Sequence, residues 1–152
     1  MGGVEAFDDV LAANARYTAP NVPGRAARGL AVITCMDSRI DVLAMLGLQA
    51  GDAKVLRNVG ARVTGDVLSA LVLAVHVLGV NRVLVIAHTD CRMSKATDDE
   101  LHAEMLARGL DTRSLDFHMI EDQAATLGRD VQKVRSSPYL PAELAVAGGL
   151  YV

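Results

Sequence analysis

An apolar run of strand length, Leu30 to Thr34, breaks off abruptly into the polar stretch from Cys35 to Asp41. The run reads L-A-V-I-T and contains β-branched residues, which is typical of a strand buried in a sheet. In an open parallel sheet, the loops that leave the carboxyl ends of the strands form the crevice where ligands bind. We therefore expect Cys35, Asp37 and Arg39 to lie together at the tip of such a strand.

A second apolar run ends in the same way. Residues 83–87 read V-L-V-I-A and lead into H-T-D-C-R-M at positions 88–93. The two strands are neighbours in the 2-1-3 order common in doubly wound sheets, an order that places Cys35, His88 and Cys91 in one crevice. Two thiolates and an imidazole are a recognised zinc ligand set, and three protein ligands leave a fourth position for water, as in catalytic sites. The sequence therefore predicts a site for Zn2+, which tolerates sulfur ligands and needs no redox role.

The remaining periodicity predicts an α/β fold with a mainly parallel central sheet flanked by helices. Strands are expected at residues 30–34, 53–56, 82–87 and 144–152, and helices at residues 7–17, 42–48, 66–78, 97–109 and 116–135. Thr97 and Glu100 have the spacing of a capping box, and Gly109 stops the helix that they open. We expect one domain over residues 1–152, in which residues 1–23 form an N-terminal helix and a linker.

The sequence patterns of two of these helices indicate contact with a second subunit. The segment 66–78 is apolar on nearly every side, so one small sheet cannot cover it. The N-terminal helix is followed by T-A-P-N-V-P-G, which separates it from the rest of the chain. It either lies on its own domain or reaches across to a neighbouring copy.

Composition excludes several classes of function. The 152 residues are 51% hydrophobic and 22% charged, which suits one globular domain, and the net charge of −3 comes without a Lys/Arg cluster. We therefore expect no nucleic-acid partner. No charged leader and no apolar run of about 18 residues is present, so we expect no membrane partner and a cytoplasmic protein. Two cysteines are too few for a disulfide scaffold.

The individual residues also have simpler interpretations. Cys35 alone could be a small buried apolar residue. Asp37 and Arg39 could form a surface ion pair, belong to a turn capped by Ser38, or support the metal ligands. A structural zinc site would use Asp37 as a permanent fourth ligand, and a redox site would join Cys35 to Cys91 without metal.

The sequences C-M-D-S-R and H-T-D-C together resemble the β-class carbonic anhydrases, including compact bacterial relatives similar to carbonyl sulfide hydrolase. The resemblance continues through G-D-A-K-V-L-R-N-V-G, from Gly51 to Gly60, and the apolar helix that follows. It is strong from Leu30 to Met93 and looser elsewhere. The paired motifs are specific to that family, whereas either motif alone is not.

The resemblance implies that Cys35, His88 and Cys91 bind zinc. It also implies a dyad in which Arg39 holds the Asp37 carboxylate by paired hydrogen bonds, while Asp37 accepts one from zinc-bound water. The implied reaction is the reversible hydration of carbon dioxide to bicarbonate by zinc-bound hydroxide. The implied assembly is a homodimer or a dimer of dimers, with the N-terminal helix packed on the neighbour and the crevice at the interface.

Some residues depart from the family pattern. Arg92 and Met93 follow the second cysteine, where family members commonly have glycine, and Val59 stands where alanine is usual. We expect Arg92 and Met93 to form a bulkier and more charged rim beside the metal. Carbonyl sulfide, a linear analogue of carbon dioxide, is therefore an alternative substrate for the same site.

Overall fold

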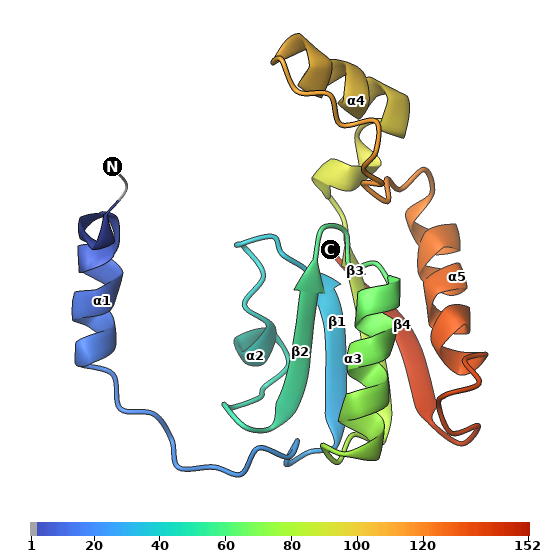
Figure 1. Cartoon of the computed structure of the whole chain (residues 1–152). Coiled ribbons are helices and arrows are strands. Elements are labelled where there is room, and N and C mark those ends of the chain that lie inside the picture. Colours follow the sequence, from blue (N-terminus) through green and yellow to red (C-terminus); the bar gives the residue numbers. More distant parts are fainter. Residues whose placement is uncertain (1–2) are drawn as a thin grey trace.

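The computed structural model describes residues 3–152 and contains a four-stranded sheet in the order β2-β1-β3-β4, in which every neighbouring pair is parallel (Figure 1). The strands are β1 (Leu30–Cys35), β2 (Ala53–Asn58), β3 (Arg82–His88) and β4 (Ala145–Tyr151). This arrangement confirms the predicted α/β fold and the adjacency of the first and third strands. All four carboxyl ends therefore meet at one edge of the sheet.

The described part of the chain contains seven helical segments, and polar side chains cap three of them. They are η1 (Val4–Phe7), α1 (Asp8–Ala15), α2 (Val42–Met45), α3 (Gly65–His76), η2 (Arg92–Ser94), α4 (Asp98–Ala107) and α5 (Gln123–Arg135). The Asp41 side chain caps α2 by accepting a hydrogen bond from the Ala44 amide. Thr97 and Glu100 form the predicted capping box at the start of α4.

The helix expected over residues 116–135 is wrong in its first third, because α5 begins only at Gln123. The Asp122 side chain caps α5 by accepting from the Ala125 amide. Upstream, His118 has a φ of 55°, and the Ile120 amide donates to the Met93 carbonyl. A left-handed residue and a tertiary hydrogen bond stop the apolar pattern there from continuing a helix.

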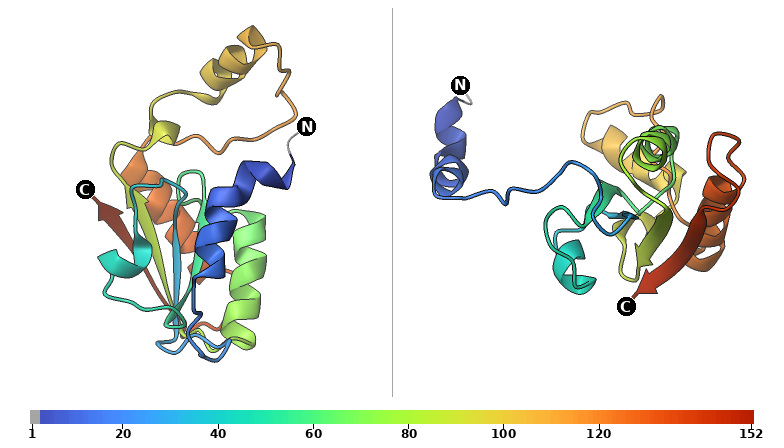
Figure 2. Two further views of the ribbon diagram at one scale, coloured as in Figure 1. Left: turned by 90° about the vertical axis from the view of Figure 1, so that its left-hand side faces the viewer. Right: turned by 90° about the horizontal axis from the view of Figure 1, so that it is seen from below.

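The two faces of the sheet carry different apolar clusters. Along β1, Val32 and Ile33 point to opposite faces, as successive strand residues do. Ile33 packs on the side covered by α3 and α5, while Val32 packs on the side of α2 (Figure 2). Each fully buried aliphatic side chain contributes about 1.5–3 kcal/mol. Both clusters also include side chains that are only partly buried, such as Leu30 and Leu84 on the α2 side and Leu68 on the other.

The N-terminal helix lies apart from the rest of the molecule, at the end of an extended segment (Figures 1 and 2). The base of that segment is tied to the body by hydrogen bonds from the Ala26, Ala27 and Arg28 amides to the carbonyls of Leu78, Gly51 and Asp52. No residue of α1 is buried. We name residues 3–29, which contain α1 and the extended segment, the arm.

Two further helices leave apolar surface exposed. Val67, Leu71 and Ala74 of α3 are buried against the sheet, but Leu73 is 54% exposed. α4 projects beyond the carboxyl edge of the sheet and has no buried residue (Figure 1). Within residues 3–152, none of the helices has both the length and the apolar character needed to cross a membrane.

Candidate metal centre

Three metal-binding side chains meet at the carboxyl edge of the sheet. Cys35 is the last residue of β1, His88 is the last residue of β3, and Cys91 follows in the next loop. All three are buried, and one ligand atom from each lies within 4.8 Å of the others. The structure thus brings together the three residues that the sequence predicted as zinc ligands.

The two ring nitrogens of His88 have different surroundings. Nδ1 lies 2.7 Å from the Thr89 carbonyl oxygen, so Nδ1 carries the hydrogen and Nε2 keeps a lone pair. Nε2 is buried and has no hydrogen-bond partner within the described part of the chain. An unsatisfied buried polar atom costs about 1–3 kcal/mol. A metal ion between Nε2 and the two sulfurs would remove that cost, so these residues fit such an ion.

The surroundings of the two thiols favour a cation as well. Burial raises the pKa of Cys91, and the nearby Cys35 raises it further. The Gly60 amide donates a hydrogen bond to Cys35 Sγ at 3.3 Å. Gly60 has a φ of 90°, and a Cβ at this position would lie 3.1 Å from Ile120 Cδ1. A glycine is therefore needed for this close approach of backbone to sulfur.

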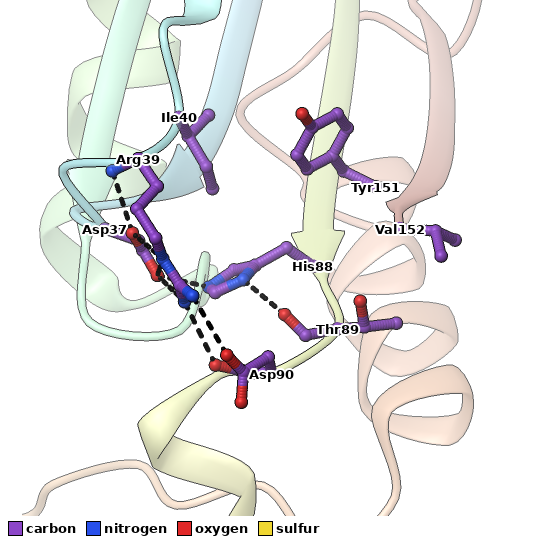
Figure 3. A pocket seen from close by; sticks show the side chains of 8 residues that line it. All are labelled: Asp37, Arg39, Ile40, His88, Thr89, Asp90, Tyr151 and Val152. Carbon is purple, nitrogen blue, oxygen red and sulfur yellow. Dashed lines mark hydrogen bonds and ion pairs between the residues drawn. The ribbon is translucent and has the colours of Figure 1, made fainter.

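Asp37 and Arg39 form a tight pair beside His88, one of the three candidate ligands (Figure 3). Arg39 donates to both carboxylate oxygens of Asp37, from Nε to Oδ1 at 3.0 Å and from Nη2 to Oδ2 at 2.6 Å. The Arg39 amide adds a hydrogen bond to Oδ1 at 2.9 Å. These contacts hold the pKa of Asp37 well below its usual range. Asp37 Oδ2 lies 4.0 Å from His88 Nε2, so the paired carboxylate is next to the metal centre.

A cleft of about 230 Å³ opens above this pair. Its lining comprises Asp37, Arg39, Ile40, His88, Thr89, Asp90, Tyr151 and Val152 (Figure 3). The expected rim of Arg92 and Met93 is not part of this lining. Arg92 pairs instead with Glu104 of α4 at 3.0 Å, and Met93 is buried.

Sequence reasoning missed three residues of the site. Arg57 donates to the carbonyls of Cys35 and Asp37, both at 2.8 Å, and so holds the tip of β1. Gln123 donates to the His88 carbonyl at 2.9 Å. Asp90 accepts from Arg39 at 2.9 Å. A signal existed for Asp90, which lies between two candidate ligands in H-T-D-C, but no periodicity marks the other two.

Known proteins are similar to this chain in sequence. Residues 30–137 match the family described as carbonic anhydrase. β-Carbonic anhydrase 1 of Mycobacterium tuberculosis is 40% identical over 96 residues, which are 61% of this chain and 59% of the relative. A carbon disulfide hydrolase of Acidithiobacillus thiooxidans is 28% identical over 144 residues, covering 82% of this chain and 72% of the relative.

A solved structure agrees over almost the whole length. The carbonic anhydrase of Streptococcus mutans has a TM-score of 0.89 and 33% sequence identity, and the match covers 95% of this chain and 90% of that one. The match to the mycobacterial relative, by contrast, spans 59% of that protein's length. The family match covers both strand tips and the helices between them, and the chain belongs to the β-carbonic anhydrase family.

Proposed function

We propose that this chain catalyses the zinc-dependent, reversible hydration of carbon dioxide to bicarbonate, with zinc bound by Cys35, His88 and Cys91. One observation carries the proposal: both oxygens of Asp37 are engaged by Arg39 beside the three ligand atoms. A carboxylate held in this way is kept from the metal and leaves the fourth position for water.

The residues of the centre have separate tasks. Zinc at this site supplies a Lewis acid that lowers the pKa of water and so provides a nucleophile. Asp37 accepts a hydrogen bond from the attacking water and orients it. Arg39 fixes Asp37, and the Thr89 carbonyl fixes the His88 tautomer through Nδ1. The cleft of about 230 Å³ admits a small linear substrate between Ile40 and the dyad.

A non-catalytic, structural zinc site is less consistent with these contacts. It requires Asp37 as the fourth ligand, and the carboxylate would then have to give up two hydrogen bonds to Arg39. Charge-assisted hydrogen bonds are stronger than those between neutral groups, and contact with water weakens them. The Asp37 side chain is 17% exposed and that of Arg39 is 64% exposed, so this contact is shielded from water only on the Asp37 side.

Hydrolysis of carbonyl sulfide is a second candidate. Two relatives that match this chain, from Acidithiobacillus thiooxidans and Saccharolobus solfataricus, are named carbon disulfide hydrolase. Carbon dioxide, carbonyl sulfide and carbon disulfide are linear molecules with an electrophilic central carbon. The same nucleophile can attack the central carbon of each molecule. The size of the cleft then determines whether a molecule with oxygen or one with sulfur at its ends fits.

We also propose that the chain works as a dimer. Phe7, Val10 and Leu11 of the arm are all about half exposed or more. Leu30 and Leu84, on the α2 side of the sheet, are only partly buried. A second copy whose arm crosses to the neighbour would cover apolar surface on both chains.

The decisive experiment loads the protein with zinc and follows carbon dioxide and carbonyl sulfide side by side by stopped flow. We expect one zinc per chain and faster turnover of carbon dioxide, rising toward alkaline pH. Two thiolates reduce the effective charge of zinc, so water there should ionise above the value of about 7 found with three histidines. Metal-free protein with full activity would reject the proposal, and faster turnover of carbonyl sulfide would favour the second candidate.

A further inference from the structure

Arg39 joins the two strand tips that carry the metal ligands. Its Nε and Nη2 donate to Asp37, while Nη1 donates to Asp90 Oδ2 at 2.9 Å and Nη2 also approaches the Asp90 carbonyl at 3.4 Å. Asp37 follows Cys35 at the end of β1, whereas Asp90 lies between His88 and Cys91 after β3. The guanidinium therefore bridges a carboxylate from each tip (Figure 3).

A second Asp-x-Arg pair elsewhere in the chain shows what the local motif does alone. Arg113 donates to Asp111 from Nε at 2.8 Å, from Nη2 at 2.6 Å and from its amide at 3.2 Å. These are the contacts of Arg39 with Asp37, formed on an exposed loop. Among the described residues, Arg113 has no second carboxylate of this kind. The pairing is thus a local property of the motif, and it does not determine where the pair points relative to other segments.

Asp90 is itself held in place. Lys95 Nζ contacts Asp90 Oδ1, while Arg39 takes Oδ2. Hydrogen bonds from Lys95 and then Arg39 lower the pKa of Asp90 to about 2, so the carboxylate is charged at neutral pH. Its backbone has a φ of 57°, a left-handed conformation that is unfavourable for most residues but that Asp and Asn tolerate better.

We propose that Asp90 is a positioning residue that holds Arg39, and through it Asp37, away from the metal, and that Lys95 supports Asp90. The inference rests on the proposed zinc site. Without the Asp90 carboxylate, Arg39 loses the contact that fixes it to the loop after β3, and it releases Asp37 more often. Asp37 then reaches the fourth metal position in a larger fraction of molecules, which closes the site to water.

The test measures access to the metal rather than turnover. Cobalt(II) replaces zinc, and imidazole is titrated at pH 8.5 while the visible cobalt bands are followed. Imidazole is neutral there, so removing a nearby negative charge has little direct effect on its binding. We compare wild type, Asp90→Asn, Arg39→Gln and the double variant, with Asp111→Asn as the matched control. Asparagine keeps the tolerance for positive φ and removes the charge.

The Asp90→Asn change should raise the apparent imidazole dissociation constant about three- to fivefold with cobalt content unchanged, because the open fraction falls. Lys95→Met should shift it in the same direction by less. In the Arg39→Gln background, Asp90→Asn should not raise the dissociation constant further, because Asp37 is already free of Arg39. An unchanged constant in Asp90→Asn, or an equal effect in both backgrounds, would overturn the role of Asp90. A wild-type protein that binds no cobalt would instead reject the metal centre itself.

Discussion

His88 is a buried histidine whose hydrogen-bonded Nδ1 leaves Nε2 directed toward two sulfurs. Replacing His88 by alanine should abolish stable zinc binding, because losing even an outer partner of a metal-bound histidine costs about 10–100-fold in affinity. Zinc should raise the melting temperature of the wild type but not of this variant, since binding to the folded state is also stabilisation. Metal analysis and calorimetry measure both effects.

The matched control is His76→Ala. His76 is exposed and contacts the Tyr139 carbonyl at 2.7 Å, so its loss should leave zinc content unchanged. Full zinc retention in His88→Ala would contradict the assignment of the ligand.

Arg39 keeps Asp37 charged and in place. Replacing Arg39 by alanine should free Asp37 to bind zinc, with turnover falling about 100-fold or more while metal content stays full. Asp37→Ala should leave the fourth position open to water but lower activity through loss of the orienting hydrogen bond. Stopped-flow rates from pH 6 to 10 and zinc analysis check both variants.

Arg113→Ala is the control for this experiment, since it removes the same kind of local Asp-x-Arg pair from an exposed loop. It should leave the rates unchanged. Wild-type rates in Arg39→Ala at every pH would show that the dyad is merely a surface ion pair.

α5 is connected to the loop after β2 through the buried Asp130 carboxylate, which is 1% exposed. Asp130 accepts from Arg62 Nε at 2.8 Å and from the Val63 amide at 3.0 Å, and Lys133 lies 3.0 Å away. The same loop contains Gly60, the donor to Cys35 Sγ. This ion pair therefore couples the packing of a helix to the position of a candidate metal ligand.

Asp130→Asn should lower the free energy of unfolding by about 3 kcal/mol at pH 7, because it leaves Arg62 without its buried partner. Burial raises the pKa of Asp130, but the hydrogen bonds from Arg62, Val63 and Lys133 outweigh burial and lower it. The unfolded value is about 3.9, so the stabilisation is complete well above that pH and is lost as pH falls through the lower folded-state pKa.

Urea unfolding of the wild type and Asp130→Asn between pH 7 and pH 3 measures the difference in their free energies of unfolding. It should be constant from pH 7 to about pH 5 and shrink below about pH 4. Glu143→Gln, an exposed change, serves as the control and should have little effect. A stability difference that grew toward acid pH would be inconsistent with a lowered pKa.

Some features of the fold and the site could be predicted from the sequence and others could not, for physical reasons. The strand tips were predictable, because apolar runs such as Leu30–Thr34 end sharply and parallel strands share one edge. Residues 116–122 were not, because the left-handed His118 and the contact of Ile120 with Met93 are tertiary effects. The Arg39–Asp90 contact spans two loops whose conformations no periodicity encodes. The role of the dyad and the oligomeric state stay predictions.

The arm carries apolar side chains that the proposed dimer would cover. Leu11 is 48% exposed, and no residue of α1 is buried within its own chain. Leu11→Glu should therefore weaken a dimer without disturbing the fold of the body. Loss of one buried aliphatic side chain is worth about 1.5–3 kcal/mol, or about a 10- to 100-fold higher dissociation constant.

Sedimentation velocity over a range of concentrations measures that constant. Asn14→Asp places a charge at a polar position of the same helix and should change it little. A charge at the exposed Leu73 of α3 tests whether that helix also lies in the interface. Wild-type protein that sediments as a stable monomer would rule out the proposed assembly.

The order of the strands also determines at which stage of folding the three candidate ligands come together. β1 lies in the middle of the sheet, and Thr34 pairs with Ile86 across 52 positions of sequence. Such long-range pairing forms slowly, and until it forms Cys35 is far from the other two ligands. Zinc should therefore slow unfolding while leaving the refolding rate unchanged, as stopped-flow fluorescence of a labelled chain would measure. A refolding rate that rises with zinc would place the pairing of β1 with β3 in the folding nucleus. Otherwise, a newly made chain completes its sheet first and acquires its metal as the last step of maturation.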